Sequence, residues 1–415
     1  MTSKVERAPQ VVGPTPWGMV VLLGSLTALG PLAIDMYLPS LPTIGADLRA
    51  SAAATQATMA AFLAGMAVGQ LLYGPASDRI GRRPLILLGV TVFVMASAAC
   101  ALASSIELLV AARFIQAIGA TAGAVIGRAV VRDRFDQNET ARMLSLMMLI
   151  MGLAPVLAPL AGGAMLGVVG WRAIFWVMAA IGAVLGVAAA LRLNETRSAE
   201  TAAHARLEHP IRSYLSLTSS PRLVGYILAA AFNGAALFSY IAASPDLLIR
   251  TYGIAPAHFG WVFGTNGIGI VIASQVNGRL LRHRPLDEIL ARASVAALAA
   301  LAAALLLATA AVTGVGGPFS VLPLLFAVLA SYSFIQGNAI AGALGVDPRR
   351  AGSISALAGG MALTAGAVAA WAVGALHDGT PRPMALVILA CLIASALALH
   401  GLALKPRPIA GTAQG

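Results

Sequence analysis

Charge is scarce in this chain. Asp, Glu, Lys and Arg make up only 10% of its 415 residues, whereas a soluble domain carries about a quarter. Hydrophobic residues make up 59%, and the mean hydropathy is +0.85. A chain with this composition cannot bury its apolar surface inside a water-soluble globule. The composition therefore excludes a soluble globular protein. We expect the chain to fold in a lipid bilayer.

Residues that build covalent, metal or nucleotide sites are also rare. The two cysteines, Cys100 and Cys391, lie in apolar runs and are interpreted as small hydrophobic residues, which excludes a disulfide framework. The six histidines show no metal-ligand spacing, and the sequence has no phosphate-binding P-loop. The apolar runs contain no nucleophile–base pair. We therefore expect no metal, no cofactor, no use of ATP and no enzymatic activity.

Positive charge exceeds negative charge, with a formal net charge of +11. Lys and Arg lie in short loops between apolar runs and build no basic domain, so we expect no nucleic-acid partner. With the N-terminus in the cytoplasm, most of the 27 Lys and Arg residues fall in cytoplasmic loops. The exceptions are Arg49, Arg172, Arg250 and Arg382 outside and Arg113 within a span. The positive-inside rule then predicts that both termini are cytoplasmic.

Twelve apolar runs reach the roughly 20 residues that a membrane-spanning helix needs. The predicted spans are 17–37, 53–73, 84–104, 108–130, 143–167, 172–192, 223–245, 257–279, 290–312, 319–343, 352–375 and 384–404. Gly and Ala abound in these runs, which favours close helix contacts in lipid. Because the first run is long enough to span, we expect no cleavable signal peptide.

The polar stretch 194–221 divides the spans into two sets of six. "GPASDRIGRRPL" follows the second span of the first set, and "GRLLRHRPL" follows the second span of the other set. This weak repeat predicts an all-α membrane protein of two pseudo-symmetric six-helix bundles. The predicted parts are a cytoplasmic tail 1–16, an N-terminal bundle 17–193, a cytoplasmic central loop 194–221, a C-terminal bundle 222–404 and a cytoplasmic tail 405–415.

The stretch "GQLLYGPASDRIGRRPL", residues 69–85, is the most specific motif. Its glycines allow a tight turn, and its aspartate can cap a helix or pair with a cation from a neighbouring helix. Such a pair would latch the two halves on the cytoplasmic side. A positive-inside loop with incidental turn residues is the alternative, but it does not explain the ordered combination. The predicted latch consists of Gly74, Asp78, Arg79, Gly81, Arg82 and Arg83.

This stretch resembles the G-x-L-a-D-r-x-G-r-k signature loop of the major facilitator superfamily. "RFIQAIGATAGAVIGRAVV" (113–131) is similar to the family's fourth-span motif, and "APVLAPLAGG" (154–163) to the fifth-span motif of its drug:proton antiporters. "AIDMYLPSLP" (33–42) resembles the opening phrase of the bicyclomycin-resistance (Bcr/CflA) multidrug efflux branch. The second half matches mostly by pattern, because its loop 278–286 lacks the Asp.

Asp35 and Arg113 are ionisable residues that the predicted spans place at similar depth, near the outer ends of the first and fourth spans. Charged groups within spans are costly and usually face a cavity or a partner. The resemblance implies that the first and fourth spans line a central cavity. We therefore predict that Asp35 and Arg113 carry proton coupling as a pair. The alternatives are a loop cap at Asp35 and a structural ion pair at Arg113.

Aromatic, Met and amide side chains on the first, fourth, seventh and tenth spans are the candidates for cargo binding. Few fixed polar groups among them suit varied amphipathic ligands, although each residue could equally serve helix packing. They are Met36, Tyr37, Gln116, Phe232, Asn233, Phe238, Tyr240, Tyr332, Gln336 and Asn338. In the fifth span, we predict a helix bend at Pro155, Pro159, Gly162 and Gly163, because proline frees backbone carbonyls.

The resemblance implies a proton-driven exporter of small drugs, of the bicyclomycin or chloramphenicol kind, across the bacterial inner membrane. Its energy source would be the proton gradient, its partners protons, drug and lipid, and we expect a monomer. One alternative is an exporter of the same fold that is specific for a single amino acid, sugar or natural product. A second alternative, an intramembrane enzyme, would need a nucleophile–base pair or a metal cluster in the spans, and the sequence offers neither. A channel or receptor, the last alternative, would lack obligatory proton coupling.

Overall fold

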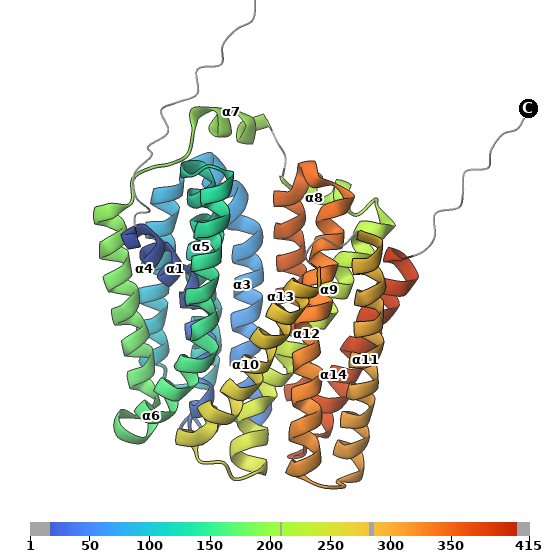
Figure 1. The fold of residues 1–415 in the computed structure, drawn as a ribbon. Helices are drawn as coiled ribbons and strands as arrows, with labels where there is room; N and C mark the ends of the chain where they lie inside the picture. Colours follow the sequence, from blue (N-terminus) through green and yellow to red (C-terminus); the bar gives the residue numbers. More distant parts are fainter. Residues whose placement is uncertain (1–16, 208–209, 282–285, 405–415) are drawn as a thin grey trace, which may run out of the picture.

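The computed structural model describes residues 17–207, 210–281 and 286–404 (Figure 1). These residues form helices and contain no strand. The helices are α1 (Trp17–Asp35), α2 (Leu41–Asp47), α3 (Ala52–Ile80), α4 (Arg82–Ala101), α5 (Ile106–Arg134), α6 (Gln137–Arg192), α7 (Ala199–Leu207), α8 (Pro210–Leu217), α9 (Pro221–Pro245), α10 (Pro256–Leu281), α11 (Leu286–Thr313), α12 (Pro318–Val346), α13 (Ala351–Ala375) and α14 (Arg382–Ala398). Short helical turns are η1 (Leu38–Ser40), η2 (Asp246–Thr251), η3 (Pro348–Arg350) and η4 (Leu399–Ala403).

Eleven of the described helical stretches are long and apolar enough to cross a membrane. One of them, α6, contains two of the twelve predicted spans, 143–167 and 172–192. Between these spans Gly170 has φ 76° and ψ 172°, and the chain reverses direction there (Figure 1). Residues with a side chain rarely adopt this left-handed φ, which explains why a glycine lies at the turn. The eleven stretches therefore agree with twelve crossings.

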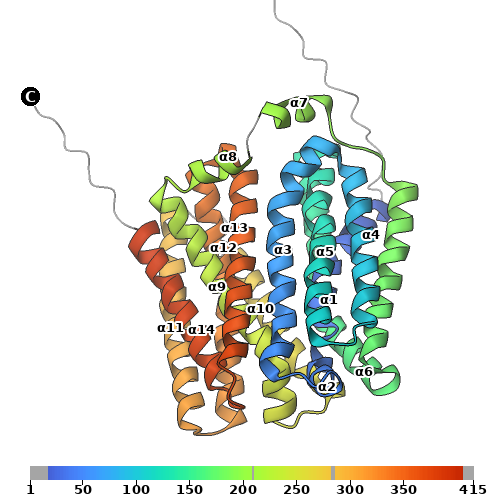
Figure 2. The same ribbon diagram turned by 180° about the vertical axis from the view of Figure 1, so that it is seen from behind.

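Two bundles stand side by side, as both views show (Figures 1 and 2). Helices α1 and α3–α6 pack together in the N-terminal half, and α9–α14 pack together in the C-terminal half. The halves meet along α3 with α13 and along α6 with α10. At the second seam the backbones nearly touch, because a Cβ added at Gly163 would lie 2.4 Å from the carbonyl oxygen of Pro256. Small residues thus permit the close approach that lipid-embedded helices need.

The predicted bend in the fifth span is not accompanied by a break in helical geometry. Helical dihedral angles continue through Pro155 and Pro159, and the non-helical residue within α6 is Gly170. The two glycines nearby provide contact surface, since a Cβ at Gly162 would overlap the backbone of Met36 and one at Gly163 that of Pro256. Gly162 and Gly163 therefore allow α6 to pack closely against the end of α1 and the start of α10. A bend at the prolines stays a prediction.

The central stretch 194–221, predicted as a loop, contains the helices α7 and α8. The segment of α7, "AETAAHARL", consists mostly of strong helix formers, and α8 begins at Pro210, a favoured first helical residue. Helix α7 packs against α3, whereas α8 packs against α13. Figure 1 shows both at the same end of the molecule. The connection between the halves therefore contacts each half through its own short helix.

Candidate functional site

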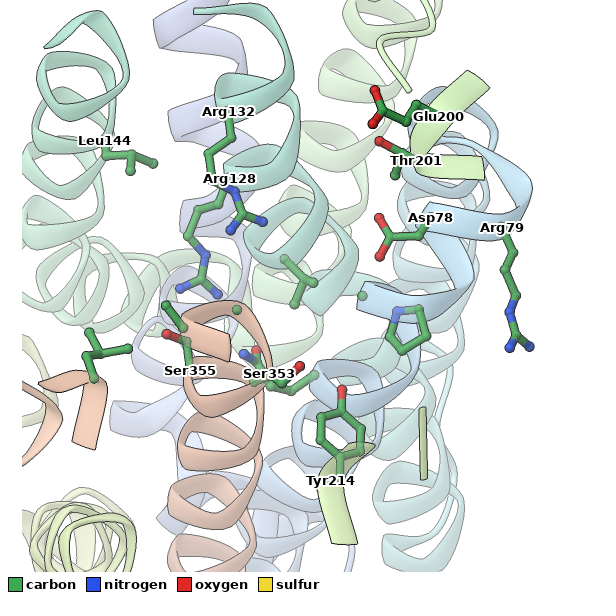
Figure 3. Close-up of a pocket in the computed structure, with 18 residues that line it drawn as sticks. Asp78, Arg79, Arg128, Arg132, Leu144, Glu200, Thr201, Tyr214, Ser353 and Ser355 are labelled. Carbon is green, nitrogen blue, oxygen red and sulfur yellow. The ribbon is translucent and has the colours of Figure 1, made fainter. Parts of the chain in front are cut away.

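A cavity of about 630 Å³ opens between the two halves at the end that carries α7 and α8. We call this end the arginine-rich end and the other the opposite end. The polar side chains of the lining come from α3, α5, α7, α8 and α13 (Figure 3). The lining residues are Gln70, Gly74, Pro75, Asp78, Arg79, Val125, Arg128, Arg132, Leu144, Glu200, Thr201, Tyr214, Leu344, Ala351, Gly352, Ser353, Ser355 and Ala356.

The signature turn lies beside this cavity and is held by an acid that sequence reasoning missed. Glu195 accepts hydrogen bonds from the backbone N–H groups of Arg82 (2.9 Å) and Arg83 (3.2 Å), the first residues of α4. An anion at a helix N-terminus satisfies otherwise unpaired N–H groups and favours the helix dipole. Gly81 makes room for it: φ is 128°, and a Cβ there would lie 2.6 Å from the Glu195 carboxylate.

The side chain of Arg82 joins three helices of the N-terminal half. It lies 2.5 Å from Asp78 of α3 and 2.9 Å from Asp133 at the end of α5, and it donates to Ser77 at 2.6 Å. Arg82 is only 4% exposed, so these acids compensate a charge that would otherwise be buried alone. Sequence reasoning also missed the role of Asp133 as a partner of Arg82. The available signal was an acid among arginines, in "RDRF", directly after the fourth predicted span.

Within the described residues, the side-chain contacts of Arg82 and Arg83 in the predicted latch stay on one side of the cavity and do not join the two halves. Arg82 and Arg83 bond to residues of the N-terminal half, and Arg83 also donates to the Ala190 carbonyl at 2.9 Å. Asp78, which pairs with Arg82, lines the cavity (Figure 3). The physical reason is that the cavity separates the halves at this end. A latch role in another conformation stays a prediction for these residues.

Loss of the charge at Glu195 should lower thermal stability in detergent. Burial opposes ionisation of Glu195, but backbone N–H groups of Arg197, Arg82, Arg83 and Thr196 outweigh it and hold its pKa below the ordinary 4.5. The folded state is therefore stabilised above pH 4.5, and this contribution is lost as pH falls through the lowered pKa. We expect Glu195→Gln to cost on the order of 1 kcal/mol at pH 7.

Thermal unfolding followed by tryptophan fluorescence at pH 7 and pH 4 measures this difference. Glu139→Gln is the matched control, because Glu139 is exposed in the first turn of α6, where Asp136 and not Glu139 is the N-cap residue. The difference between wild type and Glu195→Gln should shrink at pH 4. An unfolding midpoint that is unchanged at pH 7 would contradict the capping role.

At the opposite end the halves are joined. Arg250 of η2 donates to the carbonyl oxygen of Pro42 in α2 at 3.3 Å. Its guanidinium is positioned by Asp246 at 3.1 Å, and Asp246 also lies 3.0 Å from the Nδ1 atom of His377. Turn η1, which follows α1, packs against both α9 and α10. The structure therefore combines a cavity at the arginine-rich end with closure at the opposite end.

Asp35 lies at this closed end, as the last residue of α1. It is 3% exposed, and within the described chain its carboxylate forms no ion pair and no side-chain hydrogen bond. Its electrostatic neighbour across the interface is Tyr240 of α9, whose hydroxyl accepts a hydrogen bond from Asn266 of α10 at 2.8 Å. A carboxylate buried without a cation is costly in its ionised form.

Arg113 is fully buried in the N-terminal half. Its guanidinium carbon lies 4.1 Å from the ring centre of Tyr37 and 4.0 Å from that of Phe62. One nitrogen donates to Gln116 at 2.6 Å, while Nε and Nη2 have no hydrogen-bond partner within the described residues. The aromatic rings stabilise the cation by cation–π contact.

The direct Asp35–Arg113 ion pair that the sequence suggested is therefore absent from this conformation. No contact within 4.0 Å joins the two described side chains. The reason is that the Arg113 side chain lies between Tyr37 and Phe62 inside the N-terminal half, whereas Asp35 interacts electrostatically with Tyr240 of the C-terminal half. The Arg113 guanidinium nevertheless contacts the ring of Tyr37, which follows Asp35 by two residues, and the similarity in depth stays a prediction.

The predicted cargo-binding residues lie apart from the 630 Å³ cavity, whose described lining contains none of them. Gln116 lies inside the N-terminal half, where it accepts a hydrogen bond from Arg113 at 2.6 Å and donates one to Ser97 at 2.7 Å. Met36 and Tyr37 are buried at the closed end. A cargo role for these residues stays a prediction.

In the C-terminal half several of the predicted residues link helices. Asn233 of α9 donates to the Tyr332 carbonyl at 3.0 Å and to Gln336 of α12 at 3.4 Å. Phe238 packs against Gly366 of α13. Phe232 is half-buried.

Sequence reasoning missed two amides of α10. Asn266 bonds to Tyr240, and Asn277 bonds to Asn338 at 3.3 Å. An asparagine within an otherwise apolar run was the signal that could have identified each of them.

Comparisons with known proteins agree with this architecture. A sequence model described as the Major Facilitator Superfamily matches residues 23–370. An uncharacterized MFS-type transporter, YdgK of Bacillus subtilis, is 36% identical, covering 92% of this chain and 95% of the relative. A bicyclomycin resistance protein homolog of Haemophilus influenzae is 32% identical over the same shares. The multidrug resistance protein MdtL of Shigella dysenteriae is 30% identical, covering 93% and 95%.

Solved structures show the same fold at low identity. A D-xylose–proton symporter superposes with a TM-score of 0.70 at 14% identity, covering 92% of this chain and 97% of that one. A bacterial homolog of the human lysosomal transporter Spinster gives 0.69 at 16% identity, covering 94% and 96%. With the family match over most of its length and membrane-crossing helices in two bundles, this chain belongs to the major facilitator superfamily of multi-pass membrane transporters.

Proposed function

We propose that this protein exports small amphipathic compounds, drugs among them, in exchange for protons. Cargo reaches the cavity at the arginine-rich end and leaves at the opposite end, after the halves rock to open that side. The relatives named for bicyclomycin resistance and multidrug resistance support the cargo class. The energy source is the proton gradient, and the protein acts as a monomer.

The observation that carries proton coupling is the state of Asp35. It is a buried acid without a cation, at a closed end where the two halves meet. Arg113 supplies the complementary observation, because two of its nitrogens have no hydrogen-bond partner among the described residues. An acid and a cation that are both unpaired in one conformation can pair in another. Proton uptake by Asp35 would then control which conformation is favoured, which is the linkage that an antiporter needs.

Charge distribution supports the direction of export. The arginine-rich end carries the signature turn with Arg79, Arg82 and Arg83, together with Arg128 and Arg132. Positive residues mark the cytoplasmic side of a membrane protein. The cavity therefore faces the cytoplasm of a bacterium, in its inner membrane, with both termini on that side.

Everted membrane vesicles test this function directly. Vesicles containing the protein are energised until their lumen is acidic, and a chemically varied drug panel is then added while a pH-sensitive dye reports the lumen. We expect several unrelated drugs to release protons from the lumen, and cells expressing the protein to lose their drug resistance with a protonophore. Drug transport that never moves protons would refute antiport, whereas a response to one compound alone would favour the single-metabolite exporter.

A further inference from the structure

Two arginines, Arg128 and Arg132, project from α5 into the cavity (Figure 3). Arg128 and Arg132 are four residues apart, so they share one face of the helix. Within the described chain neither forms an ion pair, and the hydrogen bond of Arg128 goes to the carbonyl oxygen of Ala124 at 2.8 Å. Two like charges at this spacing repel each other. The pair therefore leaves a surplus of positive charge on this wall.

The acids that share the lining are engaged elsewhere. Asp78 lies 2.5 Å from Arg82, and Glu200 is not free either. In Figure 3 both lie on the side of the cavity away from Arg128 and Arg132. They therefore do not neutralise the positive wall.

Donors and apolar groups complete the surroundings of the two arginines. Ser353 and Ser355 of α13 line the cavity, and within the described residues neither hydroxyl has a hydrogen-bond partner. Val125, Leu144 and Leu344 supply apolar surface. An occupant that suits this lining has an acidic group next to an apolar body, because guanidinium groups bind carboxylates through charge-assisted hydrogen bonds.

Membrane orientation alone does not require arginines inside a cavity. Arg134 lies at the end of the same helix, is exposed, and is not part of the lining. It satisfies the positive-inside rule as well as Arg128 and Arg132 do. The position of these two residues therefore needs a reason of its own.

We propose that Arg128 and Arg132 form an anion-binding site at the mouth of the cavity, which takes the acidic group of an amphipathic organic acid. This inference rests on the proposed function, because it assigns a chemical class to cargo that arrives from the arginine-rich end. The recognised chemistry is an anion on an apolar body. An acidic solute and an anionic lipid share it, so the experiment needs an arm for each.

Binding of 2-naphthoate and 2-naphthamide to the full-length protein in phosphatidylcholine nanodiscs provides the first arm, because the two probes differ mainly in charge. We expect naphthoate to bind wild type about tenfold more tightly. The double variant Arg128→Gln/Arg132→Gln should lose this preference, Arg128→Lys/Arg132→Lys should retain most of it, and the control Arg134→Gln should retain all of it. Equal affinities in wild type, or a preference that survives in the double Gln variant, would overturn the site.

The second arm repeats the titration in nanodiscs that also contain phosphatidylglycerol, at raised salt so that the surface potential is screened. Unchanged naphthoate affinity supports a solute site. A loss seen in wild type but not in the double Gln variant would show that lipid headgroups occupy the arginines, and would overturn the assignment to cargo. Asp35→Asn should keep the naphthoate preference, since Asp35 is not in the lining. If wild type prefers naphthoate but exports no compound in exchange for protons, the proposed function is refuted and the anion-binding site is not.

Discussion

Asp35→Asn should abolish uphill export while leaving the protein folded and able to bind cargo. In an antiporter, proton binding and cargo binding must oppose each other, whatever the charge of the cargo. Cargo affinity of wild type should therefore fall as pH falls through the range in which Asp35 takes up a proton. Asparagine resembles the protonated carboxyl and cannot titrate. The variant should show the low-pH affinity of wild type at every pH, and its pH dependence should disappear.

The measurement is cargo binding to purified protein from pH 5 to 9, together with accumulation in everted vesicles. Asp35→Glu restores an acid one methylene further from the backbone and should recover part of the coupling. Asp246→Asn is the matched control, because Asp246 is an acid of the opposite end that Arg250 and His377 already hold. We expect this control to keep its pH dependence. If Asp35→Asn still releases a proton when cargo binds, the proton carrier lies elsewhere.

The spans could be predicted from the sequence because lipid imposes a local rule, roughly 20 apolar residues per crossing. The turn at Gly170 illustrates the limit of that rule. Two apolar runs were separated correctly there, although the helical stretch in the structure is nearly continuous across them. The helices α7 and α8 were missed, because a polar stretch between halves carries no apolar periodicity strong enough to predict them.

Pairings between distant residues were beyond sequence reasoning. The 69–85 motif was recognised, but its partners are Asp133 at the end of α5 and Glu195 after α6, and only the fold brings them to Arg82. The depth of Arg113 was predicted from its place in the fourth span. Its contacts with Tyr37 and Phe62 depend on helix rotation and could not be predicted. Helix rotation likewise decides that Gln116 faces Ser97 rather than a cavity.

The second large effect is expected at Arg113, where function and stability should separate. The guanidinium is completely buried, and two of its nitrogens have no hydrogen-bond partner in the part of the chain that the structure describes. A buried charge without full compensation destabilises the fold, so its replacement by an apolar residue of similar length removes that penalty. The cation–π contacts that are lost would offset about 2 kcal/mol of this gain. Arg113→Met should therefore keep or raise the thermal unfolding midpoint.

Transport by Arg113→Met should nevertheless be lost. If Arg113 pairs with Asp35 in the conformation that opens the opposite end, methionine removes that partner. Arg113→Lys keeps the charge but loses the planar stacking between Tyr37 and Phe62, so it should retain partial transport. In the Asp35→Asn background, Arg113→Met should cause no further loss, because both changes break one interaction. Because Asp35→Asn already abolishes uphill export, the double-mutant cycle is run on the rate of downhill cargo exchange, with unfolding midpoints taken in parallel. Additive losses of transport, or a fall in stability that parallels them, would identify Arg113 as a structural residue rather than a coupling residue.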